Sequence, residues 1–148
     1  MTTEAENTAD EAAIRAVIDR FAKAIRDKDV NGVVSPFAND IVSFDIVPPL
    51  QTAGAATFLT HWQQLFESHQ GPIHVEFPDV RIVIGDGVAF SYCVHRIKGT
   101  LKNGQETDRW MRWTACYRKT NGRWLIVHEH VSVPSDLKSG KALMDLKP

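Results

Sequence analysis

Histidine side chains give this sequence its clearest candidates for chemistry. His128 and His130 are separated by one residue in an apolar, strand-like run, so both imidazoles lie on one side of the expected strand. This spacing can present two nitrogen ligands to one metal ion, but the sequence offers no obvious third ligand. The alternative is a polar interface or a hydrogen-bond network, which we favour. We therefore expect no bound metal.

His95 is a second candidate because of the residues that share its side of a strand. Ala89, Ser91 and Cys93 are small, so they leave space beside the imidazole if this side faces a cavity. In such a cavity His95 would serve as a polar donor, or as an acid and base near neutral pH. The alternative is a half-exposed strand histidine whose ring binds a backbone group.

Several common catalytic motifs are missing. The sequence has no glycine-rich phosphate loop, no Ser-His-Asp order and no Cys-x-x-Cys pair, which argues against nucleotide hydrolysis, serine hydrolysis and dithiol redox chemistry. Cys93 and Cys116 lie in apolar runs, and we interpret them as small buried hydrophobic residues rather than a disulfide. We expect no cofactor.

Length and charge limit the class of protein. The 148 residues, 43% of them hydrophobic, suit one compact domain. With 17 basic and 18 acidic residues the net charge is −1, so no overall field favours nucleic acid or anionic lipid. No apolar run approaches the ~20 residues of a membrane-spanning helix, and residues 1–10 do not resemble a secretory signal. We expect a cytoplasmic protein that binds neither nucleic acid nor membrane.

Helical spacing dominates the first half of the chain. Thr8 and Glu11 form a capping box, after which apolar residues recur every three or four positions and predict a long helix. Asp29 can cap a second, short helix. A strand over residues 41–45 follows, and then a third helix that Gly-Pro at residues 71–72 would stop.

From Ile73 onward the apolar residues alternate, which predicts four long strands with turns at residues 85–87, 103–104 and 121–122. Pro78 interrupts the first of these strands and predicts a bulge or an edge position. Helices followed by an antiparallel meander indicate an α+β fold, with the helices on one face of a curved sheet.

Two stretches of sequence carry a resemblance to a known superfamily. The first stretch comprises Arg20-Phe21 through Asp29, Phe37-Ala38-Asn39-Asp40, Phe44-Asp45 and Gly54. The second stretch comprises residues 117–124 and 127–134. With the order of elements, they resemble the nuclear transport factor 2-like superfamily, in its SnoaL-like and ketosteroid isomerase-like branch. The second stretch is also similar to the calcium/calmodulin-dependent kinase association domain.

This resemblance implies a cone-shaped fold in which three N-terminal helices pack on a curved, mostly antiparallel sheet. The domain would span residues 9–134, between a polar tail of residues 1–8 and a C-terminal tail of residues 135–148.

The resemblance also implies a role for Asp45. In the isomerases a carboxylate at this position shuttles a proton between carbons of an enolisable substrate, which requires an apolar cavity that raises its pKa. The alternative is that Asp45 only begins the turn before Pro48-Pro49. The positions that hold the two oxyanion donors in the isomerases correspond to Phe21 and to Trp113 or a residue beside it. Because both donors are missing here, we do not expect authentic steroid isomerisation.

The turn at residues 121–122 decides which side of the last strand faces the cavity. A two-residue turn pairs Thr114 with Glu129, whereas a three-residue loop with a bulged glycine pairs it with the preceding histidine. The resemblance favours the second register, with a cavity lined by Met111, Trp113, Ala115, Val127, Glu129 and Val131. An inward Glu129 would need Arg109, His95 or water as its partner, and a perturbed pKa there would mark function.

These patterns together suggest a small-molecule-binding SnoaL-like protein with a small apolar ligand. The catalytic candidates are Asp45 and His95, and the ligand-binding candidates are Phe21, Phe44, Trp62, Trp113 and Glu129. If the protein is an enzyme, the expected chemistry is proton transfer beside a carbonyl, as in an isomerase or a cyclase.

The alternative function is a non-catalytic dimerisation or assembly domain. In both cases we expect a homodimer through the outer face of the sheet, which would include Arg112, His128 and His130.

Overall fold

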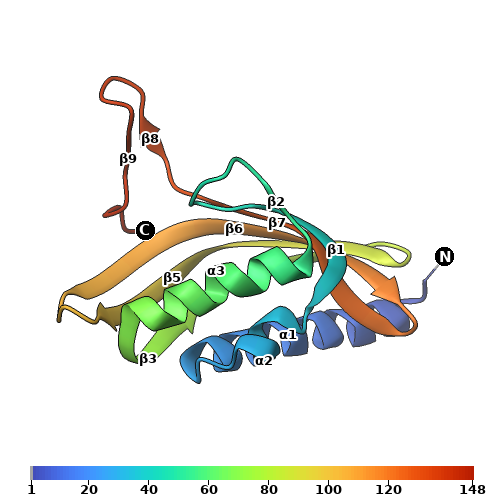
Figure 1. Ribbon diagram of the computed structural model, residues 1–148. Coiled ribbons are helices and arrows are strands. Elements are labelled where there is room, and N and C mark those ends of the chain that lie inside the picture. Colours follow the sequence, from blue (N-terminus) through green and yellow to red (C-terminus); the bar gives the residue numbers. More distant parts are fainter. Residues whose placement is uncertain (1) are drawn as a thin grey trace.

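A computed structural model describes residues 2–148, in which three helices lie on one face of a long curved sheet (Figure 1). The helices are α1 (Glu4–Arg26), α2 (Val30–Val34) and α3 (Ala55–Ser68). The strands are β1 (Phe37–Phe44), β2 (Thr52–Ala53), β3 (His69–Glu76), β4 (Arg81–Ile84), β5 (Val88–Leu101), β6 (Glu106–Thr120), β7 (Arg123–Ser132), β8 (Ser135–Asp136) and β9 (Lys141–Ala142). The α+β architecture predicted from the sequence is confirmed.

Seven strands form one mixed sheet. Six of them follow the order β2-β1-β7-β6-β5-β3, and the seventh, β4, pairs with β5. β4 pairs with the first half of β5 and β3 with the second half, on either side of the break that Pro78 predicts. β1 and β7 run parallel, and the other paired strands of the described chain run antiparallel. The helices cover the inner face of this sheet and leave the outer face open (Figure 1).

The first helix begins before the capping box that the sequence pattern predicts. Thr3 is the N-cap: its hydroxyl accepts from the Glu6 N–H at 3.2 Å, and the Glu6 carboxylate accepts from the Thr3 N–H at 2.6 Å. Thr8 lies inside the helix, where its hydroxyl donates to the Glu4 carbonyl at 2.9 Å. Residues 4–8 of the expected polar tail are therefore helical, because the capping box of Thr3 and Glu6 begins the helix before Thr8.

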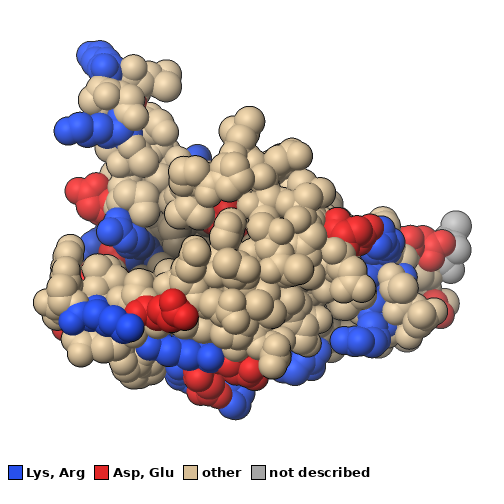
Figure 2. All heavy atoms as spheres, viewed as in Figure 1, with Lys and Arg blue, Asp and Glu red and all other residues tan. Residues whose placement is uncertain are grey.

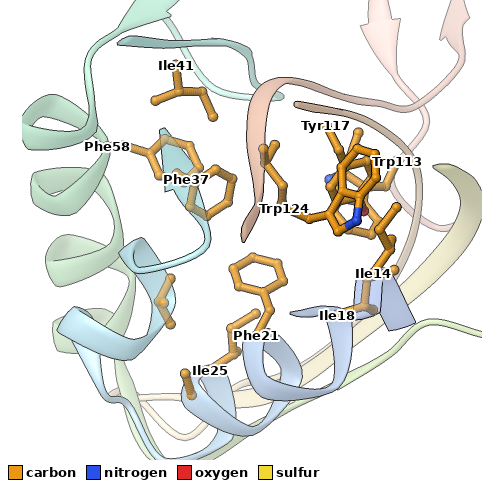
Figure 3. Close-up of a cluster of buried hydrophobic side chains, with 14 of the residues drawn as sticks. Ile14, Ile18, Phe21, Ile25, Phe37, Ile41, Phe58, Trp113, Tyr117 and Trp124 are labelled. Carbon is orange, nitrogen blue, oxygen red and sulfur yellow. The ribbon is translucent and has the colours of Figure 1, made fainter. Parts of the chain in front are cut away.

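Side chains of α1 pack against the inner face of the sheet. Phe21 lies between Phe37 and Trp113, with ring centroids at 5.6 Å and 6.1 Å (Figure 3). In the first half of α1, the buried Asp10 accepts hydrogen bonds from Trp124 Nε1 at 3.0 Å and Lys119 Nζ at 2.9 Å. These two bonds attach the first helix to the β6–β7 hairpin.

A bulge at Val127 changes the register of β7. Thr120 pairs with Arg123, so the turn has two residues, but the register then shifts and Thr114 pairs with His130. Both registers considered from the sequence are therefore wrong beyond the turn. Because a bulge accommodates one extra residue, the even-numbered residues before it and the odd-numbered residues after it face the core. Glu129 faces inward as expected, whereas Val127 does not line the cavity.

The C-terminal residues form a small two-stranded hairpin, β8–β9, for which the sequence pattern gave no prediction. This hairpin and the loop between β1 and β2 project from the sheet, away from the helices (Figure 1). The Leu143 N–H donates to the Pro134 carbonyl at 2.9 Å, which directs the chain back towards the domain.

No helix within residues 2–148 combines the length and the hydropathy needed to cross a membrane.

Candidate functional site

A cavity of about 610 Å³ lies between the helices and the inner face of the sheet. Its walls are mainly aromatic and aliphatic, and include Phe21, Phe58, Trp62, Phe77 and Trp113. The ionisable residues on its walls are Asp45, His61, His69, His95, Arg109 and Glu129. Figure 2 shows the surface hollowed beside the C-terminal hairpin, and Met144, which follows this hairpin, is part of the lining.

Glu129 is the deepest ionisable group of the cavity, with only 4% of its surface exposed. The parallel pairing of β1 with β7 places it beside Ser43, whose hydroxyl lies 3.1 Å from Glu129 Oε1. Trp113 Nε1 donates to the other carboxyl oxygen at 3.0 Å. Burial, assisted by the negative charge of Asp45, raises the pKa of Glu129 to about 7 although both hydrogen bonds oppose the shift. At neutral pH this carboxyl group therefore exists in both protonation states.

His95 stands on β5 opposite Met111, and 7% of its surface is exposed. Its ring stacks on Phe77, with centroids 5.5 Å apart, and its Nδ1 atom is buried without a partner among the described residues. Burial lowers the pKa of His95 to about 4, so the ring is neutral at physiological pH. A neutral imidazole with an unused nitrogen can donate to or accept from a ligand.

Asp45 follows the last residue of β1, on the same side as Ser43, and lies where the cavity wall passes into the β1–β2 loop. Its Oδ1 atom accepts from the Ile46 N–H at 2.6 Å. Burial raises the pKa of Asp45, while this hydrogen bond and the nearby His61 act in the opposite direction. The loop and α3 thus bring a carboxylate and an imidazole to one part of the cavity.

The histidine pair of the last strand lies on the opposite face of the sheet from the cavity. His128 Nδ1 is 2.6 Å from the Val42 carbonyl, and the rings of His128 and His130 both contact Phe44. Within residues 2–148, no three His, Cys, Asp or Glu side chains gather as a metal site would require. The pair is therefore part of the outer surface of the sheet.

Comparison with known proteins assigns the chain to a family. Residues 14–136 match the family model described as the SnoaL-like domain. The chain belongs to the SnoaL-like family. A search of curated proteins finds no match.

Solved structures similar to this SnoaL-like domain confirm the cone-shaped fold. An NTF2-like protein of unknown function from Pseudomonas putida KT2440 shares 35% identity, with a TM-score of 0.85, 95% of this chain covered and 98% of that one. The association domain of the C. elegans calcium/calmodulin-dependent kinase II shares 19%, with a TM-score of 0.69 and coverage of 85% and 97%. A ketosteroid isomerase-like protein from Erwinia carotovora atroseptica SCRI1043 shares 20%, with a TM-score of 0.69 and coverage of 82% and 93%.

The structure brings most of the predicted site residues to one cavity. Its lining includes the predicted residues Phe21, Asp45, Trp62, His95, Trp113 and Glu129. Phe44 is a correction: it is 37% exposed on the outer face, because Ile41 and Ser43 take the inward positions of β1. The predicted partners of Glu129 also need correction, since Trp113 and Ser43 bind it among the described residues.

Sequence reasoning missed several residues on the cavity wall of the SnoaL-like domain, among them His61, Phe77 and Met144. His61 lies three residues after Phe58 and four before Leu65, so helical spacing could have placed it on the cavity side of α3. Phe77 follows the alternation of its strand. No pattern identifies Met144, because its position depends on how the C-terminal hairpin folds back.

Proposed function

We propose that this SnoaL-like protein binds a small, largely apolar carbonyl compound and transfers a proton at the carbon beside its carbonyl group. The observation that carries the proposal is the cavity itself, in which aromatic walls enclose Asp45, His95 and Glu129. Its volume lies in the range of small-molecule sites. A fold of this kind also hosts proteins without catalysis, so the argument depends on these side chains.

In the proposed reaction Asp45 is the base. Partial burial raises the pKa of Asp45 from the ordinary value, which strengthens the carboxylate as a proton acceptor. It would take a proton from the carbon next to the carbonyl, leaving an enolate. Return of this proton to a different carbon gives isomerisation, and attack of the enolate on a second carbonyl gives an aldol-type cyclisation.

His95 and Glu129 would stabilise the enolate oxygen. The neutral imidazole of His95 has a buried nitrogen free for a hydrogen bond to the ligand. Glu129, which is partly protonated near neutral pH, can supply a second proton to the same end of the cavity. Trp113 is not available for this role, because its indole N–H is directed at Glu129.

Exchange of ligand protons in heavy water tests this function. We would screen apolar ketones and diketones by thermal shift, and then follow loss of the α-proton signal of each hit by NMR. Asp45→Asn should abolish the exchange or change the affinity of hits while leaving folding nearly intact. Asp40→Asn is the matched control, because Asp40 is an exposed carboxylate on the same strand. Equal thermal shifts and equal exchange rates in wild type and Asp45→Asn would refute the proposal.

A second function, self-assembly, is favoured by the outer face of the sheet. This face exposes large apolar side chains, namely Val83, Phe90, Tyr92 and Val94 on the paired strands β4 and β5, and Phe44 at the end of β1. Arg112, Thr114, His128 and His130 lie beside them on β6 and β7. An exposed apolar surface of this kind, with polar residues around it, is typical of an interface. We propose that it binds a second copy of the chain about a two-fold axis.

Sedimentation velocity at micromolar concentration tests the homodimer. Tyr92 is 49% exposed near the middle of this face, so Tyr92→Arg should convert a dimer to a monomer. Leu137→Arg places the same charge at an exposed apolar residue of the C-terminal hairpin and should leave the dimer intact. A monomeric wild-type protein would exclude this assembly.

A further inference from the structure

Arg109 is a basic side chain whose position in the cavity has no structural explanation. It stands on the inner side of β6, opposite Ile97 and two residues from Met111. The described part of the cavity lining contains no other lysine or arginine. Arg109 is partly exposed, and its inward neighbours on the sheet, Ile97 and Met111, have no polar side-chain group to pair with its charge.

The guanidinium of Arg109 has no partner in the protein. Within residues 2–148 it forms no ion pair within 4.0 Å and no side-chain hydrogen bond, whereas Arg96 on the outer face binds both oxygens of Asp108. Arg118 likewise pairs with Asp40, and Arg15 with Glu11. Arg109 therefore presents its donors to the cavity. A planar guanidinium matches a carboxylate through two parallel hydrogen bonds.

The strands give the spacing between this charge and the proposed catalytic groups. His95 is paired with Met111, one inward position from Arg109, so the two side chains begin roughly 7 Å apart along the sheet. Trp113, which donates to Glu129, lies four residues after Arg109 on β6, so the backbone positions of Trp113 and Arg109 are roughly 13 Å apart along the strand. The cavity thus has a positive group at one end and the two carboxyl groups, Asp45 and Glu129, at the other.

We propose that Arg109 binds the carboxylate of the ligand, and that the ligand class is an apolar monocarboxylic acid. Its apolar body would lie over Phe77 and Trp113, with its far end near His95 and Asp45. The opposite orientation would place an anion beside two acidic groups, which like-charge repulsion disfavours. This inference rests on the proposed function, because it uses the same cavity and orients the ligand towards the same base.

Calorimetric titration with paired probes tests the charge preference directly. The probes are 4-phenylbutyrate and saturated carboxylates of six to twelve carbons, each compared with its neutral primary amide. In wild type at neutral pH the best acid should bind at least tenfold more tightly than its amide. Arg109→Gln should remove this preference for the acid over its amide, whereas Arg109→Lys should retain part of it.

Arg123→Gln is the matched control, because Arg123 is exposed at the start of β7. It should bind acids and amides as wild type does. If wild type binds acids and amides equally, or if Arg109→Gln and Arg109→Lys keep the full preference, the carboxylate site is refuted and the proposed proton transfer still stands. If no acid or amide binds wild type, the carboxylate site is likewise refuted, and only the α-proton exchange experiment then decides the proposed function.

Discussion

Replacement of Glu129 by glutamine should change the pH dependence of stability in a defined direction. Glutamine keeps the shape of the side chain and an oxygen that can accept from Trp113, but it cannot ionise. In the folded protein the carboxyl of Glu129 is buried, and its pKa is about 7 instead of the ordinary 4.5. Glu129→Gln therefore isolates the cost of holding a negative charge at this position.

The sign and size of the effect follow from proton linkage. Between pH 4.5 and about 7 the folded state holds this proton more tightly than the unfolded state, so wild-type stability falls as pH rises through this interval. The glutamine variant lacks this loss. The free energy of unfolding of Glu129→Gln minus that of wild type should therefore increase by about 3 kcal/mol from acid to mildly alkaline pH, and then level off.

Urea denaturation followed by tryptophan fluorescence, at half-unit intervals of pH, measures this difference. His95 titrates in both proteins, so its contribution cancels when they are compared. Glu106→Gln is the matched control for the substitution itself, since Glu106 is an exposed carboxyl at the start of β6 and lacks the burial from which the rise is derived. A difference for Glu129→Gln that does not rise with pH would refute the reasoning, because it would show that burial does not raise the pKa of Glu129.

Three further outcomes are expected. Asp10→Ala should lower the free energy of unfolding by about 2 kcal/mol in denaturation experiments, because it leaves Trp124 Nε1 without its partner; full stability would contradict the role of this contact. The His95 ring should remain neutral down to about pH 5 in nitrogen NMR spectra, since burial lowers its pKa to about 4; a titration near pH 6.5 would show that the ring is solvated. Turnover of a Δ5-3-ketosteroid should be negligible, because Phe21 has no donor and the indole N–H of Trp113 is held by Glu129, and robust activity in an absorbance assay would overturn this expectation.

The regular parts of the fold were predictable because periodicity records which face of an element is buried. The Asp29 cap shows this at residue level: its carboxylate accepts from the Gly32 N–H at 3.0 Å and begins α2 as expected. The start of α1 was not predictable in this way. Thr3 and Thr8 are each followed three residues later by glutamate, and the sequence does not say which of the two boxes begins the helix.

The site was predictable where a residue departs from its surroundings. Glu129 was recognisable as a carboxyl among apolar neighbours, and His95 as a histidine on a face of small residues. The partners of Glu129 were not, because they depend on the parallel pairing that brings Ser43 beside it. Parallel pairing joins segments far apart in the chain and leaves no local pattern.

The extra residue at Val127 also affects how proteins with this hairpin can change during evolution. Deleting Val127 would straighten the strand and leave Glu129 facing inward, because the remaining residues already alternate correctly around that point. Inserting one residue just after Val127, with the bulge kept, would instead turn His128 and His130 inward and Glu129 outward. A single codon gained at this site could thus exchange the inward carboxyl of Glu129 for two further imidazoles, while every original side chain is retained.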